Sequence, residues 1–143
     1  TSEIAIVLHE IDFALKNLAA WAQPRKVRTP LMLFPGSSWV YPEPYGCALV
    51  IAPWNYPFQL AVSPLIGALA AGNCAVVKPS EAAPHTSRLI ADMISNEFDP
   101  TYLAAVEGGV EETKALLEQR FDYIFFTAGH ASARSSWRRQ HGI

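Results

Sequence analysis

Apolar residues recur every three or four positions over residues 3–21, which is the spacing of one face of a helix. The apolar positions of this face are Ile4, Val7, Leu8, Ile11, Leu15 and Leu18. Residues 23–30 are basic and bounded by prolines, which is typical of a connector. Two short apolar runs, 31–34 and 38–41, flank Pro35-Gly36 and predict a β-hairpin. We therefore expect residues 1–45 to form a helix followed by a short hairpin.

From Gly46 the pattern changes to short apolar runs that alternate with helical segments. The predicted strands are 47–52, 74–78, 103–106 and 123–127, and the predicted helices are 58–71, 87–96 and 111–119. The first strand is continuously apolar, as is typical of a strand buried on both faces. Strands that alternate with helices favour an α/β fold with a parallel, doubly wound sheet over residues 46–127.

Composition and charge exclude several classes of protein. The chain has 143 residues, half of them apolar, and a formal net charge of −2. Its 11 basic residues are scattered until the last ten positions, so we expect no nucleic-acid partner. The sequence has no apolar run long enough to span a membrane and no basic-then-apolar leader, so we expect a cytoplasmic protein. Cys47 and Cys74 lack metal-binding spacing, so we expect core thiols and no metal.

The segment Pro53-Trp54-Asn55-Tyr56-Pro57 lies between an apolar strand and an apolar helix. It follows the carboxyl end of a strand, where open α/β sheets bind ligands. The amide of Asn55 can donate to a developing oxyanion without titrating, and Pro57 suits the first turn of the next helix. Aromatic residues beside prolines also plug cores, and asparagine is common in turns. From the residues alone, packing and function are about equally favoured here.

Lys78 also ends a predicted strand, and Glu81 follows three residues later. An ammonium and a carboxylate at this edge can bind the hydroxyls of a ribose, although such a pair is more often a solvated turn. Gly108-Gly109 precedes a predicted helix and can cradle a phosphate, but a simple turn is the commoner use. Thr127 ends the last predicted strand at the same edge of the sheet. Each of these signals is weak by itself.

Taken together, the order and spacing of these segments over about residues 1–127 resemble the coenzyme-binding region of an aldehyde dehydrogenase. The segments that carry the resemblance are Glu43-Pro44-Tyr45-Gly46, Pro53-Trp54-Asn55-Tyr56-Pro57, Ala70-Ala71-Gly72-Asn73, Val77-Lys78-Pro79-Ser80-Glu81, Gly108-Gly109 and Phe125-Phe126-Thr127. The form Gly-Gly-Val-x-Glu-Thr, followed by Leu-Leu-x-x-Arg-Phe-Asp, is most similar to the class 3 branch. The resemblance implies a Rossmann-like parallel sheet with flanking helices, as part of the coenzyme-binding domain.

The resemblance also implies NAD(P)-dependent oxidation of an aldehyde to a carboxylic acid, with NAD or NADP as the cofactor. Asn55 matches the side-chain donor of the family's oxyanion hole, and Lys78 and Glu81 match the residues that hold a ribose. The other cofactor-binding positions that it implies are Ala52, Pro53, Trp54, Ser80, Gly109 and Thr127. Members of the family act on aldehyde substrates and are commonly homodimers.

The family's nucleophilic cysteine and general-base glutamate lie downstream of the part that matches. We therefore expect a fragment that is inactive by itself. Residues 128–143 lose apolar periodicity and become basic, and a one-base shift of suitable codons restores a helix of the family's kind, so we predict a frameshifted tail rather than a divergent natural one. Two alternatives are a non-catalytic module that binds NAD(P) through Lys78 and Glu81, and a related acyl-phosphate or acyl-CoA reductase.

Overall fold

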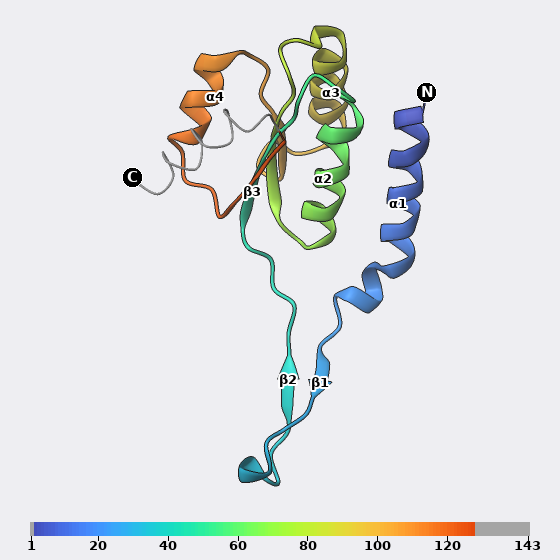
Figure 1. Ribbon diagram of the computed structural model, residues 1–143, viewed down its shortest axis with the longest axis vertical. Helices are drawn as coiled ribbons and strands as arrows, with labels where there is room; N and C mark the ends of the chain where they lie inside the picture. The colour runs from blue at the N-terminus through green and yellow to red at the C-terminus, as the bar shows by residue number, and fades with distance from the viewer. Residues whose placement is uncertain (1, 128–143) are drawn as a thin grey trace.

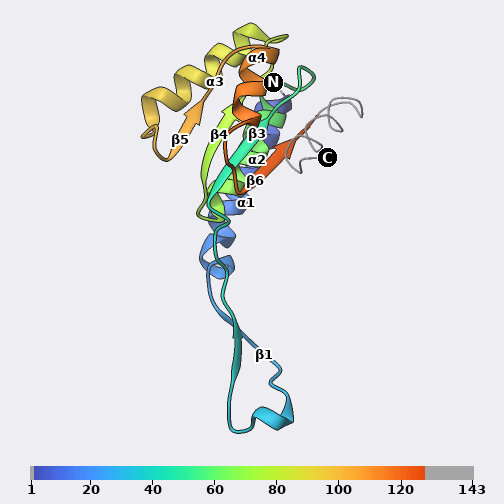
Figure 2. The same cartoon turned by 90° about the vertical axis from the view of Figure 1, so that its left-hand side faces the viewer.

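The N-terminal part of the chain forms a long helix and a projecting two-stranded arm in the computed structural model, which describes residues 2–127. Its elements are α1 (Ser2–Trp21), β1 (Arg25–Val27), the 3-10 helix η1 (Leu31–Leu33) and β2 (Ser38–Val40). Strands β1 and β2 pair antiparallel, and the arm extends away from the rest of the molecule (Figures 1 and 2). The helix over residues 3–21 is confirmed.

The remainder alternates strands and helices, as the sequence predicts. The elements are β3 (Cys47–Ile51), α2 (Gln59–Ala70), β4 (Cys74–Lys78), α3 (Pro84–Glu97), β5 (Leu103–Ala105), α4 (Val110–Leu117) and β6 (Tyr123–Phe126). The strands form one parallel sheet in the order β5-β4-β3-β6. The α/β fold with a parallel sheet flanked by helices is therefore confirmed.

Helices cover both faces of this sheet. Helix α2 packs on β3 and β4, and α3 packs on β5. In Figure 1, α4 lies on the other side of β3 from α2 and α3. This arrangement follows from the strand order, because β3, β4 and β5 succeed one another in one direction, whereas the connection through α4 returns to the far side of β3.

The core lies between the sheet and the layer of α2 and α3. It is built from alternate residues of the central strands and from one stripe of each helix. These residues are Ala48, Val50, Ala52, Ala61, Leu65, Ala75, Val77, Ile90, Ile94 and Leu103. The intervening Leu49 is also fully buried, on the opposite face of β3. Burial on both faces explains why β3 is continuously apolar in sequence.

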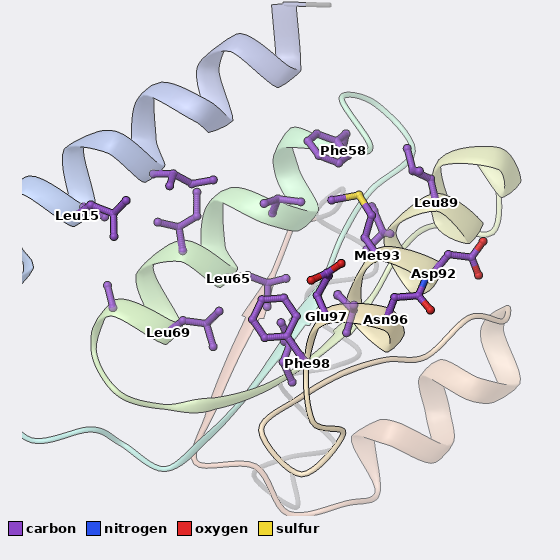
Figure 3. Close-up of a pocket in the computed structure, with 18 of the residues that line it drawn as sticks. Leu15, Phe58, Leu65, Leu69, Leu89, Asp92, Met93, Asn96, Glu97 and Phe98 are labelled. Carbon is purple, nitrogen blue, oxygen red and sulfur yellow. The ribbon is translucent and has the colours of Figure 1, made fainter.

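Helix α1 lies outside this core, alongside α2. Together with α2 and α3 it forms an apolar groove of about 860 Å³, drawn in Figure 3. The side chains that line the groove include Phe58, Leu65, Met93 and Phe98. The charged side chain of Glu97 also lines it. The groove is separate from the carboxyl edge of the sheet, because none of the candidate site residues lines it.

The predicted hairpin is wrong in its first strand. Residues 31–34 form a 3-10 turn instead, and β2 pairs with Arg25–Val27, which the sequence analysis assigned to a connector. The physical reason is that the apolar run carries no alternation, and its side chains have no face to bury: Met32 is 96% exposed and Leu31 is 87% exposed. Hydrogen bonds from the Leu33 and Phe34 amides back to residues 30 and 31 close a turn there instead.

Cys47 and Cys74 are free thiols, partly buried at the amino ends of β3 and β4. Burial is the main cause that raises the pKa of Cys47, with further contributions from Cys74 and Asp122. In the described part of the chain, no helix has the length and apolar character needed to cross a membrane. Residues 2–127 also contain no cluster of side chains suited to holding a metal ion.

Candidate functional site at the carboxyl edge of the sheet

The strand order changes direction between β3 and β6, so their carboxyl ends flank a switch point of the kind where open α/β sheets bind ligands. Two backbone hydrogen bonds extend the sheet beyond these ends. The Ala52 amide donates to the Lys78 carbonyl at 3.0 Å, and the Thr127 amide donates to the Ile51 carbonyl at 3.2 Å. Three of the residues predicted from sequence therefore meet at the carboxyl edge of the sheet: Ala52, Lys78 and Thr127.

The corner formed by residues 53–57 leaves this edge and leads into α2. Asn55 is exposed, and Trp54 beside it is 69% exposed. Within residues 2–127, the Asn55 side chain makes no hydrogen bond, so its amide is free to donate to a ligand. Tyr56 has a φ of 51°, a left-handed conformation that is uncommon for a bulky residue. The corner is thus a solvent-exposed turn in which Tyr56 has an uncommon backbone conformation.

Lys78 is the most buried charged group of the edge. Its side chain is 3% exposed, and its Nζ lies 2.8 Å from Glu81 Oε2 and 3.3 Å from the Pro79 carbonyl. The hydrogen bond from Lys78 is the main cause that lowers the pKa of Glu81, and Glu81 is half exposed. The pair therefore presents a fixed ammonium at the rim of the sheet with a carboxylate that also reaches solvent.

The neighbouring Ser80 is buried, and its hydroxyl accepts a hydrogen bond from the Ala82 amide at 3.3 Å. Ser80 thus supports the turn that carries Glu81. No hydrogen bond joins Ser80 to another candidate site residue in the described range.

The start of α4 lies near the Lys78–Glu81 pair. The Gly109 amide donates to Glu112 Oε2 at 2.7 Å, so this amide is satisfied by the first turn of its own helix. Backbone hydrogen bonds, including the one from Gly109, are the main cause that lowers the pKa of Glu112. The charges of Lys78 and Glu81 make smaller contributions to the pKa of Glu112, which Lys78 lowers and Glu81 raises.

Two site-forming carboxylates were missed from sequence. The first is Glu112, which follows Gly109 at the spacing of a capping box. The sequence therefore contained a local signal for this contact. Glu3 is the second: its Oε2 accepts hydrogen bonds from the amides of Phe58 and Gln59. No local signal reveals this contact, because 55 residues separate Glu3 from Phe58.

The donors at the edge match part of a dinucleotide. The ammonium of Lys78 and the carboxylate of Glu81 can donate to and accept from the two hydroxyls of a ribose. The N-terminus of α2 does not fit a phosphate, because Glu3 already binds its free amides. Any cofactor phosphates must therefore lie elsewhere along the edge.

Comparison with known proteins adds an independent observation. The family model described as the aldehyde dehydrogenase family matches residues 2–139. The chain belongs to the aldehyde dehydrogenase family. Among similar proteins, the 4,4'-diaponeurosporen-aldehyde dehydrogenase of Staphylococcus aureus is 52% identical over 126 residues, which are 88% of this chain and 28% of that protein. Aldehyde dehydrogenase family 3 member B2 of Mus musculus is 48% identical over 88% of this chain and 26% of that protein.

Solved structures of the family agree. A substrate-bound state of Staphylococcus aureus AldH superposes with a TM-score of 0.95 at 46% identity, over 97% of this chain and 30% of that one. A Mycobacterium tuberculosis aldehyde dehydrogenase in complex with NAD+ gives a TM-score of 0.73 at 29% identity, over 93% of this chain and 28% of that one. The predicted resemblance to the class 3 branch is confirmed by the family 3 relatives. The chain spans less than a third of the length of these relatives. The predicted frameshift falls on residues 128–143, outside the described residues.

Proposed function

We propose that this chain forms the cofactor-binding part of an enzyme that oxidises an aldehyde to a carboxylic acid with NAD or NADP. The observation that carries the proposal is the Lys78–Glu81 pair, buried at its ammonium end, at the carboxyl edge that Ala52 and Thr127 share. The Mycobacterium tuberculosis relative was solved with NAD+, which supports the same cofactor class here. Membership of the aldehyde dehydrogenase family supports an aldehyde as the substrate.

In this proposal each residue has a separate task. Lys78 and Glu81 bind the two hydroxyls of a cofactor ribose. Ala52 and Trp54 form part of the wall of the cofactor site. When bound, the cofactor supplies a hydride acceptor. The Asn55 amide donates to the oxygen that becomes negative as the aldehyde carbon turns tetrahedral. Because this donor carries no titratable proton, it stays a donor whatever the pH.

Calorimetry on the 143-residue chain tests the cofactor part of the proposal. We expect NAD+ or NADP+ to bind the wild type, and Lys78→Met to abolish binding because it removes the ammonium and keeps the length of the side chain. Lys114→Ala is the matched control, since Lys114 pairs with Glu111 on the exposed face of α4. Failure of the wild type to bind either dinucleotide would refute the proposal for this chain.

A chimera tests the role of Asn55. Residues 2–127 would replace the matching segment of the Staphylococcus aureus relative, which is 52% identical. Asn55→Ala should lower kcat for NAD(P)-dependent aldehyde oxidation by roughly 100- to 1000-fold, the usual effect of losing one oxyanion donor. The control is Asn96→Ala, which changes an exposed asparagine on α3. Equal kcat values for the two variants would remove Asn55 from the mechanism.

The second candidate is a module that binds NAD(P) without catalysis when the chain acts alone. It is favoured by the position of the thiols: Cys47 and Cys74 begin β3 and β4, at the opposite ends of the strands from Asn55. Neither can therefore attack a substrate held by Asn55. Cofactor binding by the 143-residue chain without aldehyde turnover is the expected result in this case. Assembly as a homodimer and a cytoplasmic location stay predictions.

A further inference from the structure

Glu3 lies at the start of α1, yet its carboxylate is bound to the first turn of α2. Oε2 accepts hydrogen bonds from the amides of Phe58 and Gln59, both at 3.0 Å. The first amides of a helix have no partner within the helix, and the helix dipole makes this end positive. A carboxylate placed here satisfies two donors and meets a favourable field at once.

Four consecutive positions at the start of α2 show where Glu3 fits. Pro57 has no N–H, and the Leu60 amide donates to the Tyr56 carbonyl at 3.0 Å. The amides of Phe58 and Gln59 have no backbone acceptor within residues 2–127, and Glu3 binds both. The contact is therefore a cap on the first turn of α2, because one carboxylate oxygen accepts from two consecutive amides.

This helix end is also one of the two anchors of the corner that carries Asn55. On the strand side, the Ala52 amide is held by the Lys78 carbonyl. Between the anchors, Asn55 is exposed and Tyr56 adopts its left-handed conformation. A non-glycine residue keeps such a conformation only where its surroundings impose it. The contacts at the first turn of α2 and at Ala52 are the two that flank this conformation.

We propose that Glu3 is a positioning residue for the corner 53–57, and that it sets the direction in which Asn55 offers its amide. This inference rests on the proposed function, in which Asn55 donates to the substrate oxygen. The inference gives α1 a role beyond packing on α2, because the Glu3 carboxylate near the N-terminus of α1 completes the candidate site.

Hydrogen exchange in the full 143-residue chain tests the inference. In Glu3→Ala, exchange at the amides of residues 58 and 59 should rise roughly tenfold, the usual scale of a lost helix cap. Amides in β4 and in the second half of α2 should keep their wild-type rates. The matched control is Glu10→Ala, on the same helix, because the Glu10 side chain makes no hydrogen bond or ion pair with other described residues. Glu3→Gln keeps an oxygen acceptor and should restore most of the protection.

A spectroscopic readout separates positioning from general stabilisation. Trp54 is adjacent to Asn55 and can be made the sole tryptophan by replacing Trp21, Trp39 and Trp137 with phenylalanine. Its fluorescence anisotropy should fall in Glu3→Ala and recover in Glu3→Gln. A purely structural role would instead accelerate exchange throughout α2 and leave the anisotropy of the folded protein unchanged.

Three results would overturn the inference: unchanged exchange at residues 58 and 59, an increase spread evenly over the chain, or equal effects of Glu3→Ala and Glu10→Ala. If Glu3→Ala does not fold, Glu3→Asp replaces it, because the shorter carboxylate should speed exchange at the same two amides. Calorimetry with NAD+ on the same proteins reports the proposed function separately. Absence of NAD+ binding with a positive exchange result would refute the function and leave the positioning contact intact.

Discussion

At the residue scale, the Lys78–Glu81 pair is asymmetric, and this asymmetry predicts unequal effects of mutation. Glu81→Ala leaves a buried ammonium with only the Pro79 carbonyl, so we expect it to destabilise the fold by about 1–3 kcal/mol. Lys78→Met leaves a half-exposed carboxylate that water can solvate, so its effect should stay below about 1 kcal/mol. Urea unfolding followed by circular dichroism measures both. The reverse order would show that the ammonium is solvated.

The same pair predicts a pH dependence. Folding lowers the pKa of Glu81 below its ordinary value of 4.5, mainly through the hydrogen bond from Lys78. The resulting stabilisation is fully present above that ordinary value and is lost as the pH falls through the lower folded pKa. We expect wild type to exceed Glu81→Gln in stability near neutral pH, and the gap to close in acid. A gap that is constant across this range would contradict the prediction.

Sequence alone indicates the Lys78–Glu81 pair and misses the contact of Glu3 with the start of α2. Lys78 and Glu81 follow a buried strand at a spacing that fits one turn, so their proximity is a local matter. The contact of Glu3 with Phe58 depends on how α1 docks against α2. Tertiary packing of this kind leaves no mark on the spacing of residues near Glu3.

At the element scale, the start of α4 predicts coupling between Gly108 and Glu112. Gly108 has a φ of 144°, and a Cβ at this position would overlap Glu112 Cγ. Gly108→Ala should therefore destabilise the protein by more than about 1 kcal/mol. In a Glu112→Ala background the overlap disappears and only the backbone strain persists, so the same change should have a smaller effect. A double-mutant cycle measured by urea unfolding checks this, and additive effects would exclude the steric contact.

The strands of the sheet could be predicted from sequence because they are buried, whereas the strand pairing of the exposed arm could not. β3 and β4 are buried between two layers of helices, so an uninterrupted apolar run can serve as a strand there. The run over residues 31–34 is also apolar, but it has no β-branched residue and lies at the end of an exposed arm. Which strand pairs with β2 is decided by the length of the turn between them, and composition does not encode that length.

At the scale of the whole molecule, the end of the arm concentrates apolar surface far from the core. The strongly exposed apolar residues of the arm are consecutive: Leu31, Met32, Leu33 and Phe34. On α1, by contrast, no two of the large exposed apolar residues are adjacent along the chain. Contiguous apolar patches drive association, and scattered apolar residues do not. We therefore expect the 143-residue chain to self-associate as its concentration rises.

The double variant Met32→Lys/Phe34→Lys should reduce this self-association in sedimentation velocity experiments, because the two ammonium groups repel and the apolar patch is divided. The control is Leu8→Lys, which adds one ammonium group at an exposed leucine of α1 and should have less than half the effect of the double variant. Circular dichroism should be unchanged in both proteins, since the sheet and its helices bury none of these side chains. If Leu8→Lys suppresses association as strongly as the arm variant, net charge rather than the patch controls solubility.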